Sequence, residues 1–137
     1  DPILDIAVLK VKGLKTAALD FADPPRQGDS AVVAGYPEAG PLTASSARVR
    51  GGMTFNSPDI YDRGEYQREV ISIRGQVLVG NSGGPLLSTS GDVLGIVFAA
   101  STNDPNTGYA LSAEQVTVAA GKGYTSDKPV ATGDCIG

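Results

Sequence analysis

One heptapeptide, Gly-Asn-Ser-Gly-Gly-Pro-Leu at residues 80–86, constrains the fold of this chain more than any other stretch. Three glycines surround Ser82, and an apolar run lies on each side of the heptapeptide. Glycine accepts positive φ angles and lets another backbone come close, so we expect a tight turn between two strands. The turn could be an ordinary glycine-rich hairpin. It could also hold a nucleophilic serine exposed, with neighbouring backbone N–H groups directed at the same point.

Glycine and proline divide the rest of the chain into short β-prone runs. With 18 glycines and 9 prolines among 137 residues, many turns and few long helices are expected. Strands are predicted over residues 5–12, 30–36, 42–55, 68–75, 85–88, 93–100 and 108–111. Gly51 and Gly52 predict a bend or bulge, and residues 14–22 could be a strand or an irregular arm. Short strands at regular intervals are typical of an antiparallel barrel or sandwich, so the predicted fold class is all-β.

The clearest helix signal begins at Ser112. A serine can cap a helix, and Gln115 three residues later completes the pattern of a capping box. Val116 and two alanines follow, and Gly121 and Gly123 are expected to end the helix. The sequence therefore predicts one short helix near the C-terminus.

Polar residues dominate residues 56–67, which we expect to form a surface loop. Its aromatic and charged residues could form a binding patch, although a solvated loop is favoured. These residues are Tyr61, Arg63, Glu65, Tyr66 and Arg68.

Several function classes receive no support from composition. The net charge of −4 does not favour nucleic-acid binding. No apolar run approaches the roughly 18 residues of a membrane-spanning helix, so membrane contact is expected only through a segment outside this chain. We find no Cys/His ligand set and no phosphate-binding loop, so neither a metal nor a cofactor is expected. Residues 1–4 carry no secretion signal and lead into a predicted strand, so we expect the chain to begin inside a domain.

The heptapeptide resembles the nucleophile loop of chymotrypsin-like serine proteases, in the form found in bacterial HtrA-type members. Two further matches follow the family's chain order. Asp-Ile-Ala-Val-Leu at residues 5–9 resembles the strand of the triad aspartate, and Val-Leu-Gly-Ile-Val at residues 93–97 resembles the strand leading to the substrate-pairing segment. The resemblance implies a double β-barrel. Residues 1–22 would end the N-terminal barrel, residues 23–29 would connect the barrels, and residues 30–137 would form the C-terminal barrel with its helix.

The resemblance also assigns catalytic roles. Ser82 would be the nucleophile, and Asp5 would orient a histidine and stabilise its imidazolium form. The backbone N–H groups of Gly80 and Ser82 would form the oxyanion hole. Asn81 replaces an aspartate that in digestive members pairs with the N-terminus freed by cleavage, so activation by that route is not expected.

The resemblance implies a substrate-binding region as well. Gln76, six residues before the serine, would lie at the base of the primary specificity pocket, and its neutral side chain does not support a preference for arginine or lysine. Gly108 would form the far wall of the pocket. Three residues would pair with the substrate backbone: Phe98, Ala99 and Ala100. Family members often carry a serine near the triad aspartate where Phe98 falls. All of these residues could instead be barrel core and turn.

The chain contains no histidine. Because the triad needs a base of near-neutral pKa, we expect a segment N-terminal to residue 1 to supply it, and we interpret the chain as the C-terminal portion of a longer peptidase. The alternative is an inactive protease-fold module that binds peptides or serves as a scaffold.

The single cysteine, Cys135, could be a free thiol or one half of a disulfide with the N-terminal segment. A disulfide is favoured, which predicts an oxidising, extracytoplasmic location in a bacterial periplasm or cell envelope.

Overall fold

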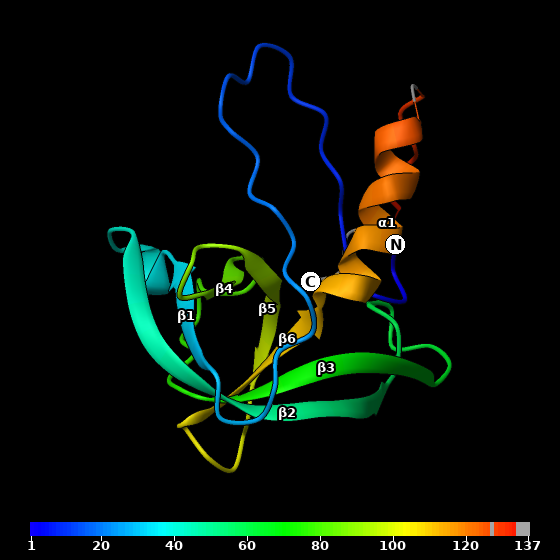
Figure 1. Ribbon diagram of the computed structural model, residues 1–137. Helices are drawn as coiled ribbons and strands as arrows, with labels where there is room; N and C mark the ends of the chain where they lie inside the picture. The colour runs from blue at the N-terminus through cyan, green and yellow to red at the C-terminus, as the bar shows by residue number, and fades with distance from the viewer. Residues whose placement is uncertain (127, 134–137) are drawn as a thin grey trace.

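Six antiparallel strands close into one barrel in the computed structural model, which describes residues 1–126 and 128–133 (Figure 1). Around the barrel the strand order is β1-β2-β3-β6-β5-β4. The elements are β1 (Ser30–Gly35), the 3₁₀ turn η1 (Pro37–Ala39), β2 (Thr43–Ser57), β3 (Tyr66–Arg74), β4 (Pro85–Ser88), β5 (Val93–Ala100), β6 (Thr107–Ser112) and the helix α1 (Ala113–Thr125). The predicted all-β barrel with a short C-terminal helix is confirmed.

The core of the barrel consists of apolar side chains that alternate along the strands. In β1, residues 31, 33 and 35 are buried while their neighbours are more accessible, as expected where one strand face is turned inward. Ile73, Leu86 and Val97 come from three different strands and are 0% exposed. This packed interior fixes β4, which directly follows the serine loop, and its two neighbours β1 and β5.

Strand β2 is long and contains the predicted bend. Its register against β3 shifts between Val49 and Gly51, so a bulge lies where the two glycines indicated one. Before the bulge β2 pairs with both β1 and β3. Residues 51–57 pair with β3 alone, and no other strand in the described part of the chain pairs with that side.

Helix α1 begins as predicted and ends later than predicted. The Ser112 hydroxyl accepts a hydrogen bond from the Gln115 N–H at 3.4 Å, but the Gln115 side chain accepts from the Glu69 N–H instead of closing a capping box. The helix runs through Gly121 and Gly123 to Thr125, so the prediction that these glycines end it is wrong. At Gly123 an added Cβ would lie 2.6 Å from the Cβ of Val8, so this glycine permits close packing.

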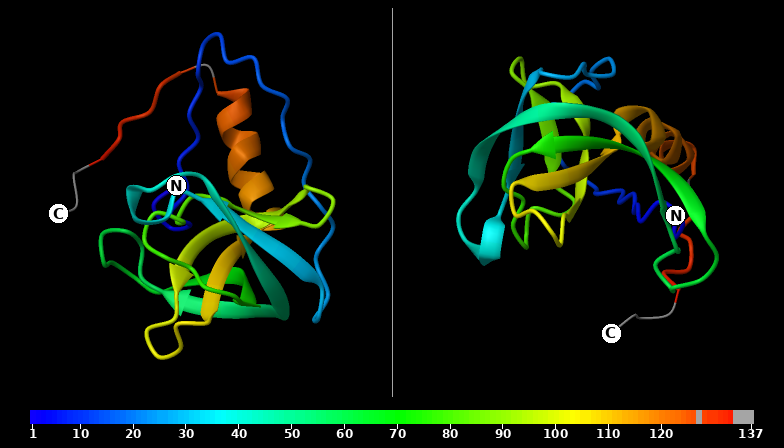
Figure 2. Two further views of the ribbon diagram at one scale, coloured as in Figure 1. Left: turned by 90° about the vertical axis from the view of Figure 1, so that its left-hand side faces the viewer. Right: turned by 90° about the horizontal axis from the view of Figure 1, so that it is seen from below.

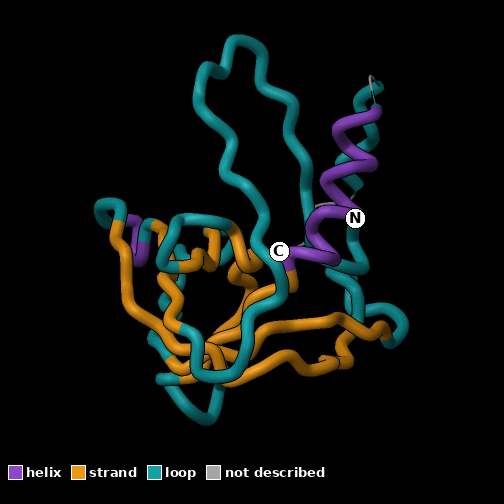
Figure 3. Tube along the Cα trace, viewed as in Figure 1, coloured by secondary structure: helices purple, strands orange, loops and turns teal. Residues whose placement is uncertain are grey.

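Residues 1–22 are irregular, and the predicted strand over residues 5–12, the expected last strand of an N-terminal barrel, is wrong for this structure. A strand needs a partner for its backbone groups, and within the described residues only Phe21 forms a bridge, to Val93. The segment extends away from the barrel as a long loop beside α1, with both rising from the same end (Figures 2 and 3). Most of its large apolar side chains are exposed, including Leu9 and Leu14.

The loop between β2 and β3 is shorter than predicted, because the two strands extend to Ser57 and Tyr66. Arg68 is not part of a surface patch, since it is only 6% exposed. Its Nε donates to the Ile3 carbonyl at 2.7 Å, and its Nη2 donates to the Pro58 carbonyl at 2.9 Å. Arg68 therefore attaches the start of the chain to the β2–β3 hairpin.

Candidate active site

Ser82 lies exposed on two consecutive turns that lead into β4. The Asn81 N–H donates to the Leu78 carbonyl at 3.0 Å, and the Gly84 N–H donates to the Asn81 carbonyl at 3.0 Å. Gly80 and Gly83 flank the serine with φ angles of 97° and 80°, a region that side-chain-bearing residues rarely adopt. The predicted tight turn at the heptapeptide is confirmed.

Two neighbouring strands hold this serine loop in place. On one side Asn81 is buried against β1, where a Cβ at Gly35 would come within 2.8 Å of the Asn81 Oδ1. On the other side the Gly83 N–H donates to the Val97 carbonyl at 2.8 Å, and the Val97 N–H donates to the Gly84 carbonyl at 2.9 Å. The serine is exposed, but the backbone that carries it is fixed.

The turn η1 sets the orientation of the peptide group before Gly80. The Val79 carbonyl accepts a hydrogen bond from the Glu38 N–H at 2.7 Å. Because a trans peptide directs its N–H opposite to its carbonyl, the Gly80 N–H points away from Glu38. Glu38 and Ala39 adopt φ angles of 55° and 58°, and such left-handed conformations in non-glycine residues cost about 1 kcal/mol or more.

The N–H groups of Gly80 and Ser82 donate to no acceptor within the described part of the chain. Two unused donors next to an exposed hydroxyl are what an oxyanion hole requires, because they can bind negative charge that develops on a substrate carbonyl. The assignment of these two groups stays a prediction.

Asp5 is exposed and has a φ angle of 56°. Its side chain forms no hydrogen bond or ion pair with the described residues, and none links it to Ser82. The adjacent Ile6 packs on a buried cluster of Val70, Leu111 and Val116, and Phe98 packs on the same cluster. The segment that carries Asp5 thus reaches the neighbourhood of β5, whereas its triad role stays a prediction.

The predicted substrate-pairing residues lie where β5 continues past β4. The pairing of β4 with β5 reaches Ile96, and beyond it Ala99 and Ala100 pair only with β6. Phe98 falls at a bulge in that pairing, and its ring contacts Phe55 edge-on at a centroid distance of 6.3 Å. One side of this segment is therefore not covered by a strand, as substrate pairing requires.

The two predicted pocket residues differ in exposure. Gln76 is exposed, and Gly108 is buried against Val77, which occupies the space that a Cβ at Gly108 would need. Their roles, and those of the three residues in β5, stay predictions.

Sequence reasoning missed the contributions of Glu38 and Arg68. Glu38 contacts Val79 through a backbone hydrogen bond, so its amino-acid type does not indicate the contact. A signal existed for Arg68, because it shares the inward alternation of Val70 in β3.

The β5–β6 turn next to Gly108 is organised by Asp104. Its carboxylate accepts hydrogen bonds from the Thr107 hydroxyl at 2.6 Å and the Asn106 N–H at 3.0 Å, and Arg50 lies 3.5 Å away. These hydrogen bonds, above all that of Thr107, lower the pKa of Asp104 below its usual value, with a smaller contribution from Arg50. The role of Asp104 here is structural.

Among the described residues, no group of three or more acidic, cysteine or histidine side chains could hold a metal ion. No described helix is long and apolar enough to span a membrane. Cys135 lies outside the described residues.

A family model described as a trypsin-like peptidase domain matches residues 1–96. The chain belongs to this family. The serine protease Rv3671c of Mycobacterium tuberculosis is 42% identical over 138 residues, which cover 99% of this chain and 34% of that relative. The putative protease Do-like 14 of Arabidopsis thaliana is 34% identical over 95 residues, covering 67% of this chain and 22% of that relative. The chain thus spans about a third of its curated mycobacterial relative.

Solved structures support the same assignment. The crystal structure of the active form of the Rv3671c protease from M. tuberculosis matches with a TM-score of 0.94 and 41% identity, covering 100% of this chain and 61% of that chain. An inactive form of the same protease matches with a TM-score of 0.80 and 43% identity. This match covers 89% of this chain and 63% of that chain. A serine endoprotease from Yersinia pestis matches with a TM-score of 0.65 and 18% identity, covering 82% of this chain and 38% of that chain. It therefore shares the fold.

Proposed function

We propose that this chain supplies the nucleophile and the aspartate of a serine endopeptidase, and that a histidine outside the chain completes the triad. The observation that carries the proposal is the serine loop. Ser82 is exposed there, and the N–H groups of Gly80 and Ser82 donate to no acceptor within the described residues. Contacts with β1 and β5 fix the backbone of the loop. Membership of the trypsin-like peptidase family supports the same reaction type.

The reaction would proceed through an acyl-enzyme. The histidine removes the Ser82 hydroxyl proton as Oγ attacks the substrate carbonyl carbon, and Asp5 stabilises the imidazolium that forms. The N–H groups of Gly80 and Ser82 bind the oxyanion. The histidine then protonates the departing amine, and water releases the acyl group from Ser82 by the same steps in reverse order. Substrate backbone would pair with residues 98–100.

Labelling with a fluorophosphonate tests this proposal on the whole natural protein. We expect one covalent adduct, on Ser82, and none in the Ser82→Ala variant. Asp5→Asn should label far more slowly and lose about 10⁴ in kcat, the effect known for the equivalent change in a related triad. Rapid labelling of Asp5→Asn at the wild-type rate would contradict the role of Asp5.

The absence of histidine favours one alternative, an inactive protease-fold module that binds peptides. The same experiment separates the two functions. A folded whole protein that binds peptides but neither reacts at Ser82 nor hydrolyses them would establish the alternative.

We also propose that Cys135 forms a disulfide with an N-terminal segment and that the protein works outside the cytoplasm, with any membrane attachment through a segment not included here. Two observations support this proposal. The chain has a single cysteine, and it covers only 34% of its mycobacterial relative. Intact mass with and without reductant tests the pairing. Release of a mass near 14.0 kDa only on reduction is expected if the peptide chain has been cut between the two cysteines.

A further inference from the structure

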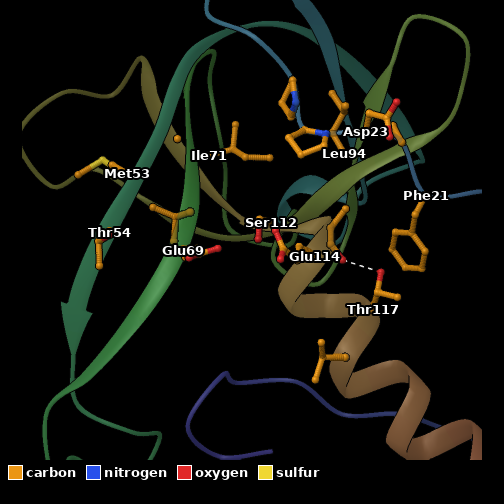
Figure 4. Close-up of a pocket in the computed structure, with 17 residues that line it drawn as sticks. Phe21, Asp23, Met53, Thr54, Glu69, Ile71, Leu94, Ser112, Glu114 and Thr117 are labelled. Carbon is orange, nitrogen blue, oxygen red and sulfur yellow. Dashed lines mark hydrogen bonds between the residues drawn. The ribbon is translucent and has the colours of Figure 1, made fainter.

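A cavity of about 730 Å³ lies between the β2–β3 hairpin, the first turns of α1 and residues 21–25. Figure 4 shows Thr54 and Glu69 on the hairpin side and Phe21 and Thr117 on the other. None of the residues assigned to the catalytic site lines this cavity. Its volume falls within the range of roughly 300–1,000 Å³ that is typical of ligand sites.

The cavity presents large apolar side chains to solvent. Phe21 and Met53 are each 45% exposed, and Val118 is 57% exposed. Ile71 and Leu94 form the deeper, buried part of the wall. An apolar group that enters here would remove exposed apolar surface, such as that of Phe21 and Val118, from water, which is favourable at about 25 cal/mol for each Å².

The charged residues of the cavity all have the same sign. Asp23, Glu69 and Glu114 line it, and no lysine or arginine does. Their carboxylates accept no hydrogen bond and form no ion pair within the described part of the chain. The cavity therefore favours a cation, and a ligand with both an apolar and a basic group fits it best.

A strand edge that can accept another backbone borders the cavity. Gly52, Met53 and Thr54 belong both to the cavity wall and to residues 51–57, which pair with β3 alone. The last hydrogen bonds on the other side of β2 involve Val49, with Gly28 and Asp29. A Cβ on Gly51 would meet nothing within 4 Å, so the space beside this residue is open in the side-chain direction. Such an open edge is a template for an added strand.

We propose that this site binds an extended peptide segment as an added strand beside residues 51–57. One apolar side chain enters the cavity. Because residues two positions apart share a strand face, basic residues two positions before and after it reach Asp23, Glu69 and Glu114. The recognised chemistry is thus basic-x-apolar-x-basic. The proposal does not depend on catalysis at Ser82.

Fluorescence anisotropy tests the proposal, with the whole natural protein carrying Ser82→Ala to prevent cleavage. The probe is a labelled, C-terminally amidated peptide, Lys-Thr-Phe-Thr-Lys-Thr. We expect saturable binding that weakens as salt is raised. The matched peptide with glutamate in place of lysine, and a version with N-methylated threonines that cannot form strand hydrogen bonds, should each bind at least tenfold more weakly. Equal binding of all three peptides overturns the proposal, as does no binding of the lysine peptide.

Variants locate the binding. Glu69→Gln combined with Glu114→Gln should weaken binding by about two- to thirtyfold, the range expected for two exposed ion pairs. Val118→Arg, at an exposed position, should abolish it. Glu65→Gln is the control, because Glu65 is exposed and does not line the cavity. Unchanged affinity in the first two variants overturns the proposal. In protein with an intact Ser82, loss of binding when a peptide boronate occupies the catalytic site also overturns it.

Discussion

Gly80 and Gly83 lie on either side of Ser82 at similar positive φ angles, but their surroundings differ. A Cβ on Gly80 would overlap the Tyr36 carbonyl oxygen, whereas a Cβ on Gly83 would meet nothing within 4 Å. The two positions share the same backbone strain and differ in the neighbour. Alanine substitutions at the two positions therefore distinguish the effect of backbone strain in the serine loop from the effect of a steric clash with a neighbour.

We predict that Gly80→Ala lowers the rate of peptide hydrolysis by the whole natural protein by about 10²–10³. If the Gly80 N–H binds the oxyanion, as proposed, this is the effect of losing one oxyanion donor, because the new methyl group would displace that N–H. Gly83→Ala is the matched control and should keep most of its activity, although both variants lose about 1–2 kcal/mol of stability. Steady-state kinetics and thermal unfolding measure the two effects. An equal loss of activity in both variants would show that strain alone is responsible.

At the scale of elements, the sequence predicted correctly those features that depend on residues close together in the chain. The cap at Ser112 and the bend at Gly51 depend on turn and terminus chemistry within a few residues. The strand over residues 5–12 failed because a strand exists only beside a partner, and a sequence pattern does not show whether one is present. The Glu38 N–H bond to Val79 was unpredictable for a related reason, since it joins two loops that only the barrel brings together.

Helix α1 offers a matched pair of glycines. Gly121→Ala should stabilise the protein by about 1 kcal/mol, because alanine is the better helix former and a Cβ there meets nothing within 4 Å. Gly123→Ala should show no gain or a loss, because its Cβ would lie 2.6 Å from Val8. Chemical denaturation measures both variants. A similar gain at the two positions would refute the packing of Val8 on this helix.

The turn between β5 and β6 has a predictable pH dependence. The pKa of Asp104 is lower in the folded state than its ordinary value of 3.8. Its contribution to stability is therefore fully present above that value and is lost as pH falls through the folded pKa. Asp104→Asn should be less stable than wild type at pH 7, and the difference should shrink below about pH 4. Urea unfolding over this pH range checks the prediction, which fails if the difference is constant.

At the scale of the whole molecule, Arg68 joins the start of the chain to the barrel. It makes charged hydrogen bonds to Ile3 and Pro58, and Pro2 accepts a further bond from the Ile60 N–H. The segment that contains Asp5 is thus attached to the domain that contains Ser82. The position of the aspartate relative to the serine depends on this attachment if both act in catalysis.

We predict that Arg68→Leu destabilises the protein by about 3 kcal/mol, because two carbonyl groups lose a charged donor. The Ile60 amide should exchange with solvent much faster, since its acceptor Pro2 is no longer held. Arg63→Leu is the control, because Arg63 is exposed and its guanidinium lies over the Tyr61 ring at 5.3 Å, away from the Ile3 and Pro58 carbonyls. Hydrogen-exchange mass spectrometry provides the test. Unchanged exchange at Ile60 in Arg68→Leu would mean that the segment is held in another way.

The position of the serine loop between β1 and β5 has a consequence for the synthesis of the protein. The loop is held by residues that come about 50 positions earlier and about 15 positions later in the chain, at Gly35 and Val97. A ribosome-bound chain that has just produced Ser82 does not yet contain Val97, so its serine belongs to an unorganised segment. Contacts between distant parts of a chain also form late in folding. If Ser82 is the nucleophile, as proposed, nascent and misfolded copies contain it without the loop geometry that catalysis requires.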